Sequence, residues 1–522
     1  MTLDTLQGSL LDLCVGAPAL AAALLLLVPA RALGTIRAIS LVGALVHLVA
    51  AVAIAALYDQ GKGGMQMLST HELVPSLGIA LTFAVDGWGV PLLVLTAVIL
   101  VTGVFASWRL EERARDFFAL LLLLTAGVAG VFVSLDLFVF FLCYEIAVLP
   151  MYLLIAIWGS SNPVAAGGPF RFIWGTLEVG SRTYAAMKLT LMLLIGSALI
   201  LAAMLGMYVA AGSTSFDLRH FAATTFDPGL QSWAFLALWV GFGSLAGVFP
   251  WHTWSPDGHA SAPTAVSMLH AGVLMKLGAF GVIRVGMVLL PEGAREWAWL
   301  VGLVAVINIV YGALAAMAQR DLKYVVAYSS VSHMGVVLLG AATLTLNGWN
   351  GAVFQMVAHG LMTGLFFALV GLVYGRAHSR YLPDMGGFGE KMPGIAVAFT
   401  VAALSSLGLP GLAGFVAEFL VFLGAWQAGQ PLWALAGLLG AFVTAVYVLR
   451  AVRDVFWGKL HLAHGDPADL KDAHGSEWVA LGVLVAALLL LGVWPRLGLD
   501  FIDIASAEYL PEVAARTLAE LR

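Results

Sequence analysis

Fourteen apolar segments divide this chain, and each is long enough to cross a lipid bilayer as a helix. A membrane span needs roughly 20 predominantly apolar residues. The segments start near residues 11, 36, 84, 117, 135, 188, 232, 265, 296, 325, 351, 394, 431 and 477. Only 11% of the residues are charged, whereas soluble domains carry about 25%. The sequence therefore predicts an all-α integral membrane protein, and its net charge of -5 gives no indication of a nucleic-acid partner.

Lysine and arginine are divided unevenly between the two sets of loops, and inner loops carry the excess in membrane proteins. With the N-terminus outside, sixteen lie in inner loops: Arg31, Arg37, Arg109, Arg113, Arg115, Arg171, Arg182, Arg320, Lys323, Arg376, Arg380, Lys391, Arg450, Arg453, Lys459 and Lys471. The outer loops hold three, Lys62, Arg219 and Arg295. We therefore expect a protein of the bacterial plasma membrane with both termini on the outer side. The tail from residue 497 is expected to form an amphipathic helix on the membrane surface.

Several charged side chains lie inside the expected spans. Glu145, Lys276 and Glu418 lie deep in theirs, and Lys188 lies nearer the inner end of the sixth span. A lone charge at the bilayer centre costs about 2.5–3.5 kcal/mol on insertion scales, so such residues usually face a helix bundle or a wet cavity. One interpretation is that these residues form ion pairs that hold helices together. Because the charged residues lie on several different helices, a path for protons or ions is favoured. Arg284, near the outer end of its span, is expected to snorkel to the interface.

Two histidines extend the possible proton path. Buried carboxyl and amine groups can exchange protons near neutral pH when a neighbouring charge changes. His333 and His359, in the tenth and eleventh spans, add neutral relay groups between Lys276 and Glu418. A buried histidine can also serve as a hydrogen-bond partner between helices, so both interpretations stay open. His270, six residues before Lys276, is expected to be a packing residue.

A proline follows the first of the deep glutamates. Pro150 lies five residues after Glu145 and has no N–H, so the carbonyl of Ile146 loses its helical partner. Water or a polar side chain can satisfy that carbonyl. We expect the helix to be loosened just after the carboxyl group, although proline kinks are also common in membrane helices.

Two spans are interrupted by glycine and proline at matching places. The seventh contains Gly241, Gly243, Gly247 and Pro250, and the twelfth contains Gly408, Pro410, Gly411 and Gly414. Inverted-repeat transporters place broken helices at corresponding positions of their two halves. Helices 4–8 and 9–13 are therefore expected to form two inverted five-helix repeats. The expected division is residues 1–116 for the first three helices, 117–290 and 296–457 for the repeats, and 477–522 for the last helix and the tail.

Long motifs in the chain resemble those of one known family. They are FLCYEIAVLPMYLLIAIWG, RTYAAMKLTLMLLIGSALIL, FPWHTWSPDGHASAPTAVSMLHAGVLMKLGAFGVIR, AQRDLKYVVAYSSVSHMGVVLLG and GLPGLAGFVAEFLVF. The chain is similar to the M-type antiporter-like subunits of respiratory complex I from about residue 84 to about residue 496. The resemblance implies a proton-translocating membrane subunit of an NADH:quinone oxidoreductase, with no cofactor or redox centre of its own. Flavin, iron–sulfur clusters and quinone would belong to partner subunits, and neighbouring L- and N-type subunits are expected in the membrane arm.

The resemblance also assigns roles to individual residues. It maps the family's buried proton-carrying groups onto Glu145, Lys276, His333, His359 and Glu418. The family normally carries a lysine in the broken seventh span and a proline two residues later, where this chain has Leu245 and Gly247. Leucine cannot carry a proton. Either Glu145 pairs with another cation such as Lys188, or the input half is altered, or the subunit does not pump.

Other functions share this type of subunit. It occurs in multi-component cation/proton antiporters and in energy-converting hydrogenases, and a chain without the seventh-span lysine could also be a mainly structural segment of the arm. The DGHASAP motif and the segment around Glu145 favour the complex I type. No nucleotide-binding glycine loop, metal-ligand cluster or catalytic triad is visible in the sequence.

Overall fold

The computed structural model describes residues 3–161 and 180–514. Arg171, one of the expected inner-loop charges, lies outside the described residues. Thirteen segments of the described chain are long and apolar enough to cross a membrane. Two shorter apolar helices, α15 (Pro393–Ser406) and α16 (Ala413–Gln427), follow one another across a break and supply the remaining span. The expected all-α membrane fold is confirmed.

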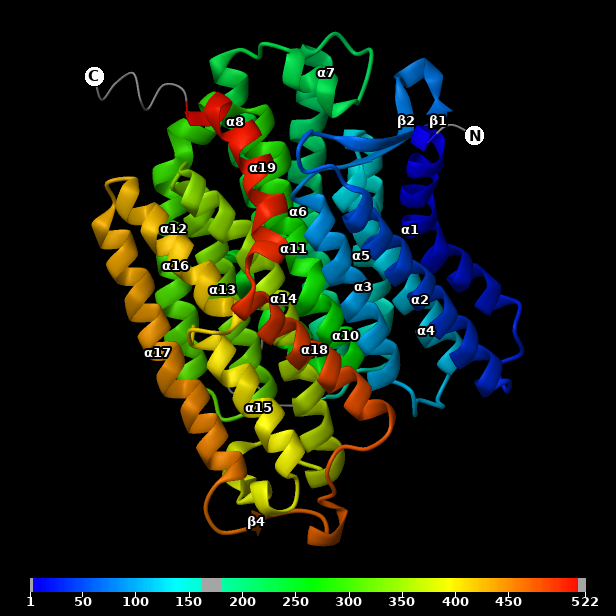
Figure 1. Cartoon of the computed structure of the whole chain (residues 1–522), viewed down its shortest axis with the longest axis vertical. Coiled ribbons are helices and arrows are strands. Elements are labelled where there is room, and N and C mark those ends of the chain that lie inside the picture. The colour runs from blue at the N-terminus through cyan, green and yellow to red at the C-terminus, as the bar shows by residue number, and fades with distance from the viewer. Residues whose placement is uncertain (1–2, 162–179, 515–522) are drawn as a thin grey trace, which may run out of the picture.

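Most helices run along the length of the molecule (Figure 1). The first six spans are α1 (Leu3–Leu26), α2 (Leu33–Leu57), α3 (Gly89–Ala106), α4 (Ala114–Val133), α5 (Leu137–Trp158) and α6 (Arg182–Ala210). The seventh comprises α8 (Pro228–Ala246) and α9 (Trp254–Ser261), and the eighth comprises α10 (Thr264–Leu269), α11 (Met275–Gly281) and two π-helical segments, His270–Leu274 and Val282–Met287. The others are α12 (Pro291–Ala318), α13 (Leu322–Ala342), α14 (Leu346–Ala377), the pair α15 and α16, α17 (Pro431–Phe456) and α18 (Ser476–Val493). Short elements are α7 (Leu218–Ala223), β3 (Met385–Gly386) and β4 (His461–Leu462), and α19 (Arg496–Ala514) ends the described chain.

Aspartates start several of these helices. The Asp136 carboxylate accepts hydrogen bonds from the backbone N–H groups of Phe138 and Val139, each at 2.9 Å, and so caps α5. Asp227 and Asp321 cap α8 and α13 in the same way. A side chain that accepts from the first free N–H groups stabilises a helix start by about 1 kcal/mol. These caps place carboxylates at the starts of spans, where they satisfy backbone N–H groups that have no partner within the helix.

A β-hairpin covers one end of the bundle, and the sequence analysis did not predict it. Strand β1 (Gln66–Val74) pairs antiparallel with β2 (Ile79–Val85). The backbone N–H of Leu135, in the α4–α5 turn, donates to the Thr82 carbonyl at 2.8 Å and ties the hairpin to the spans. The third span therefore starts at Gly89 rather than near residue 84, because the preceding apolar residues form a strand.

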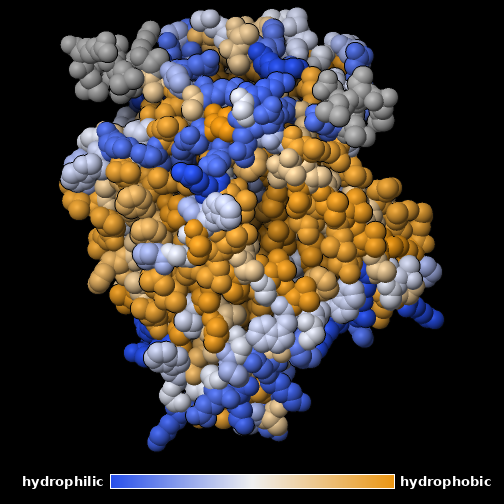
Figure 2. Space-filling view, viewed as in Figure 1, coloured by the Kyte–Doolittle hydropathy of each residue, from blue (hydrophilic) through white to orange (hydrophobic). Residues whose placement is uncertain are grey.

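Both ends of the described chain lie at the end of the bundle that carries the hairpin (Figure 1). We call this the outer end, after the expected orientation, and the opposite end, which carries β4, the inner end. Figure 2 shows a broad apolar surface between two hydrophilic ends. The expected tail helix is present as α19, where Asp503 accepts a hydrogen bond from Asn350 Nδ2 at 2.6 Å and Ser506 accepts one from Trp88 Nε1 at 3.0 Å. The helix is thus attached to α14 and α3 by polar contacts.

Both expected helix breaks are present. Helix α8 ends at Gly247, which has a φ of 75°, and the break between α15 and α16 contains Gly408 with a φ of 72°. Residues other than glycine rarely adopt this left-handed conformation. Helix α5, by contrast, continues through Pro150 to Trp158. The division into inverted repeats at residues 117–290 and 296–457 stays a prediction.

Candidate functional site

The eighth span places Lys276 at the centre of the bundle, where its side chain has no solvent exposure. Two π-helical segments flank the α-helical turn that carries it. Such segments widen a helix and are frequent at functional sites. The Lys276 ammonium donates a hydrogen bond to the carbonyl of Ala271, which belongs to the first π-helical segment. The irregular helix thus supplies an acceptor that a buried amine requires.

Three more buried side chains continue from Lys276 through spans ten to twelve. Lys276 Nζ lies 2.7 Å from Nδ1 of His359. The rings of His359 and His333 are stacked, with centroids 5.2 Å apart and planes inclined by 19°. His333 Nε2 lies 3.6 Å from Oε1 of Glu418. Four of the six residues predicted for the proton path therefore form one continuous line, and none is more than 7% exposed.

His333 lies between two backbone carbonyls. Its Nδ1 is 2.7 Å from the oxygen of Ser329, and its Nε2 is 3.0 Å from the oxygen of Ser406. A carbonyl oxygen only accepts hydrogen bonds, and a neutral imidazole has a single N–H to donate, whereas the charged form has two. The neutral His333 ring can donate to one of the two carbonyls, and the charged ring can donate to both. The Glu418 carboxyl lies close to the same ring. This position suits a histidine that alternates between the two forms.

Glu418 lies against the break in the twelfth span. A Cβ atom added at Gly408 would come within 2.9 Å of Glu418 Oε2, so the glycine leaves room for the carboxyl group. The hydroxyls of Ser405 and Ser406, at the end of α15, are buried and have no hydrogen-bond partner among the described residues. Irregular backbone at membrane depth is tolerated where it is enclosed by protein or lines a water-filled space. The break therefore provides polar surroundings for Glu418.

Lys188 forms a pair that the sequence analysis did not consider. Its Nζ lies 2.7 Å from Oδ2 of Asp257, and the hydroxyl of Tyr324 donates to Oδ1 of the same carboxylate at 2.9 Å. Asp257 belongs to α9, beyond the break in the seventh span. Each charged side chain of the pair is 24% exposed. Lys188 therefore pairs with Asp257 rather than with Glu145, and the pair can reach water.

Glu145 has no charged partner among the described residues, and its Oε1 is buried without a hydrogen bond. On the same helix, Phe140 and Tyr144 pack against Phe242 of α8, with ring centroids 5.8 Å and 6.1 Å apart. Leu245, three residues further along α8, is completely buried. Aromatic rings thus pack between α5 and α8 next to Glu145. Within residues 3–161 and 180–514, no cation pairs with Glu145 in place of the missing lysine.

Two further histidines lie between Asp257 and Lys276. The rings of His259 and His270 stack with centroids 3.9 Å apart, and His270 also stacks on Trp254 at 5.2 Å. Both nitrogens of His270 and Nδ1 of His259 are buried and lack hydrogen-bond partners in the described chain. The expectation that His270 is a packing residue agrees with these contacts. His259 lies in the DGHASAP motif but was not among the residues predicted for the proton path.

The inner end of this path is held by charged residues whose contacts the sequence did not reveal. Lys323, counted as an inner-loop charge, is buried and donates to the Ala262 carbonyl at 2.7 Å. Arg380 bonds to the carboxylate of Asp321 and to the Ala260 carbonyl, each at 2.6 Å. Both cations thus bind the end of α9 and its link to α10. They restrict the position of the segment that follows Asp257.

The expectation that Arg284 snorkels to the interface is wrong. Its guanidinium forms a buried ion pair with Asp86, at the start of the third span. The rings of Trp88 and Tyr509 lie 5.2 Å and 4.9 Å from the guanidinium carbon. A nearby carboxylate and aromatic faces stabilise the charge where it is. The pair joins the third and eighth spans to α19.

A line of polar side chains leads from His359 towards the outer end along α14. Gln355 lies one turn before His359 and Asn350 lies further towards the start of the helix, and all three are buried. Gln355 Oε1, Asn350 Oδ1 and His359 Nε2 have no hydrogen-bond partner among the described residues. Asn350 donates to Asp503, which is exposed on α19. Two amide side chains within an apolar span were a signal that the sequence analysis did not use.

Comparisons with known proteins agree with the geometry. A family model described as "NADH:quinone oxidoreductase/Mrp antiporter, TM" matches residues 170–444. A curated relative from Picosynechococcus sp., NAD(P)H-quinone oxidoreductase chain 4 1, is 35% identical over 520 residues and covers 98% of this chain and 94% of the relative. A chain in the structure of respiratory complex I from Thermus thermophilus with bound NADH has a TM-score of 0.84 and 31% identity, over 96% of this chain and 99% of that chain. A chain of the Mrp complex from Dietzia sp. has a TM-score of 0.83 at 22% identity, over 98% and 99%, which shows a shared fold alone.

Proposed function

Because this chain belongs to the NADH:quinone oxidoreductase/Mrp antiporter transmembrane family, we propose that it moves protons across the membrane in a complex I-type quinone oxidoreductase. It is a multi-pass membrane protein. The curated relative named as a chain of NAD(P)H-quinone oxidoreductase supports the redox-coupled assignment. The electron carriers and the quinone site are assigned to partner subunits, and the other membrane-arm subunits, including L- and N-type neighbours, are its partners.

The line from Lys276 to Glu418 carries the proposal. Lys276 and His359 are in direct hydrogen-bond contact, and His333 and Glu418 are 3.6 Å apart. The stacked histidine rings require one bridging water or a ring rotation between them, and polar groups across such gaps are commonly bridged by water. A proton that leaves Lys276 can thus be shared along the line of His359, His333 and Glu418. Its release from this line to the outer side, together with uptake of a new proton by Lys276 from the inner side, restores the starting state.

The pair of Lys188 and Asp257 is the proposed entry from the inner side. It is a partly exposed acid–base pair whose carboxylate belongs to α9, the segment that follows the break of the seventh span, and Tyr324 donates to that carboxylate. His259 and His270 lie between Asp257 and Lys276 in the chain, and Nδ1 of His259 and both ring nitrogens of His270, which are buried and lack partners among the described residues, offer positions for bridging water. On this proposal the pair takes over the input role that the seventh-span lysine has in the family. Glu145 then becomes a secondary group rather than half of the input switch.

The polar side chains of α14 are the proposed exit. Three successive buried groups, His359, Gln355 and Asn350, have oxygen or nitrogen atoms without partners, so ordered water is expected beside them. Asn350 contacts Asp503 on α19, and Asp503 is exposed at the outer end. A carboxylate at the mouth of such a line can accept a proton and release it to bulk water. The exit would lead to the outer side of the plasma membrane, where both termini are also proposed to lie.

The experiment that tests the function is a paired measurement of electron transfer and proton uptake in inverted membrane vesicles. Lys276→Met and Glu418→Gln remove the two ends of the relay without adding bulk. We expect both variants to assemble, and to lose proton uptake together with coupled quinone reduction. Lys391→Met, which removes an exposed lysine at the inner end, is the matched control and should behave as the unchanged chain does.

The same measurement separates the other candidate functions. Full pumping in both relay variants, with normal assembly, would indicate that this chain is a structural segment of the arm. Sodium-dependent uptake in place of proton uptake would indicate a cation/proton antiporter. Proton uptake driven by hydrogen oxidation would indicate an energy-converting hydrogenase.

A further inference from the structure

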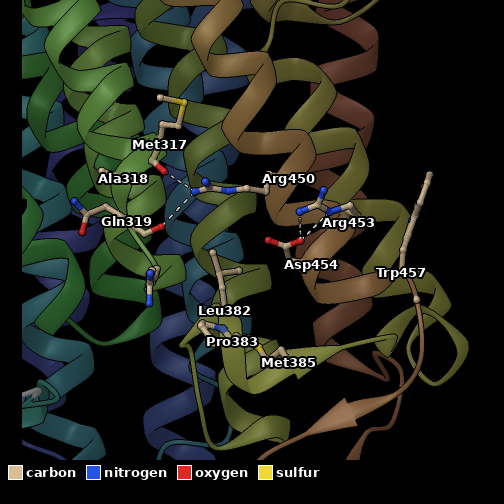
Figure 3. A pocket seen from close by; sticks show the side chains of 12 residues that line it. Met317, Ala318, Gln319, Leu382, Pro383, Met385, Arg450, Arg453, Asp454 and Trp457 are labelled. Atoms are coloured by element: carbon tan, nitrogen blue, oxygen red, sulfur yellow. Dashed lines mark hydrogen bonds and ion pairs between the residues drawn. The ribbon is translucent and has the colours of Figure 1, made fainter.

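An open cavity of about 680 Å³ lies at the inner end, between the last turn of α12, the last turns of α17 and the connection from α14 to α15 (Figure 3). Its lining includes Arg320, Arg450 and Arg453, with Asp454 as the acidic residue. Three arginines and one aspartate leave the lining with a net charge of +2. The proposed proton path uses none of the residues that line this cavity.

The arginines of the cavity have N–H donors that their present contacts do not use. Arg450 donates through Nη2 to the carbonyls of Met317 at 2.5 Å and Gln319 at 3.5 Å, and Figure 3 shows its side chain reaching across from α17 to α12. Arg453 bonds to Asp454, and Arg320 bonds to the hydroxyl of Tyr381. A guanidinium has five N–H donors. Each arginine can therefore keep its present contact and still bind an anion.

The surface next to the cavity changes from apolar to basic along α17. Phe442, Val446 and Leu449 are exposed apolar side chains on successive turns, and they lead to Arg450, Arg453 and the exposed Trp457. Leu314, one turn before Met317 on the adjoining α12, extends the apolar surface. Apolar side chains followed by arginine and tryptophan are typical of the passage from the acyl region to the headgroup region of a membrane. Here the exposed apolar side chains can contact the acyl chains of a lipid, and the arginines can contact its headgroup.

We propose that the cavity binds the phosphodiester headgroup of an anionic phospholipid of the inner leaflet, with the acyl chains along α12 and α17. Arginine matches the planar geometry of phosphate oxygens better than lysine does. Free phosphate shares this chemistry, but it would leave the exposed apolar side chains beside the cavity without a partner. The continuity of the apolar stripe with the basic cavity therefore identifies a lipid as the source of the phosphate.

Photocrosslinking in the intact complex tests the site. Phosphatidylglycerol with a photoreactive acyl chain is added to the purified, delipidated complex, and crosslinked peptides of this chain are mapped and quantified. We expect labelling within 311–320 and 439–457, weak labelling by the phosphatidylcholine analogue, and no competition by millimolar inorganic phosphate. Each arginine should contribute about a fivefold gain in binding, so Arg320→Gln with Arg453→Gln should reduce labelling roughly 25-fold at limiting lipid.

Two controls keep the result interpretable. Arg113→Gln removes an exposed inner-end arginine outside the cavity and should leave labelling unchanged. Arg453→Lys retains the charge and should retain most of the labelling. Equal labelling of the double variant and the unchanged complex, equal labelling by phosphatidylcholine, or full competition by phosphate would each overturn the proposal. A crosslink from this cavity to a neighbouring subunit in place of lipid would overturn it as well.

Discussion

Replacement of His359 by leucine tests the central link of the relay. The imidazole is the group that Lys276 contacts at 2.7 Å, and its ring lies between the lysine and His333. Leucine fills a similar space but cannot carry a proton. Lys276 and His333, on either side of it, are then too far apart to hydrogen-bond to each other. A positioned proton carrier typically contributes 10²–10⁴-fold to a transfer rate. We expect proton transfer through this chain to fall at least about 100-fold, which corresponds to roughly 2.7 kcal/mol in the barrier.

The assay is coupled quinone reduction and proton uptake in inverted vesicles that contain equal amounts of assembled complex. His47→Leu is the matched control, because His47 is another completely buried histidine whose Nδ1 lies 2.7 Å from a backbone carbonyl, that of Cys14. Each replacement removes a buried hydrogen bond, so their effects on stability should be similar in kind. Only His359→Leu should reduce uptake. Equal uptake in the two variants would refute the relay.

Four further predictions follow from the same geometry. In inverted vesicles, Lys188→Met should lower proton uptake more than Glu145→Gln does. The reason is that Lys188 contacts Asp257, whereas Glu145 has no charged partner in the described chain. A larger loss of uptake in Glu145→Gln would place the proton input at Glu145. Gly408→Ala should lower the free energy of unfolding by about 1–2 kcal/mol, because alanine is strained at a φ of 72° and its Cβ would press on Glu418. A denaturation midpoint equal to that of the unchanged complex would exclude this strain. Asp86→Asn should lower stability by about 3–5 kcal/mol by leaving Arg284 buried without its charge partner, and a thermal-shift assay on the purified complex measures this loss. Asp503→Asn should slow proton release at the outer side while leaving assembly normal, and an unchanged rate in pH-jump experiments would remove Asp503 from the exit.

The relay residues from Lys276 to Glu418 could be identified from the sequence because each is an ionisable residue in an apolar segment. A lysine or glutamate in the middle of a long apolar run is costly unless it is buried among helices, so Lys276 and Glu418 could be assigned without knowledge of their neighbours. The broken spans were visible for the same local reason, since glycine and proline interrupt helices wherever they are inserted. The fourteen spans and the unusual Leu245 are also properties of single segments.

The partners of these residues could not be predicted. Lys188 and Asp257 are separated by 69 positions in the chain, and Arg284 and Asp86 by 198. An arginine near the end of a span satisfies its charge equally well by snorkelling or by pairing, and only the packing of a third helix decides between them. The lines of unpartnered polar atoms on α14 and around His270 likewise depend on how the neighbouring helices enclose them.

For this chain, the membrane-spanning architecture and the residues that carry charge inside it follow from individual segments, because the cost of placing a charge in an apolar segment is local. Which charges meet, and where water can lie between them, depends on how those segments pack together. The folded structure also buries Leu245, at the position of the missing lysine, completely. Those outcomes depend on distances between segments that are remote in the sequence, and electrostatic and hydrogen-bond energies are decided by a few ångströms.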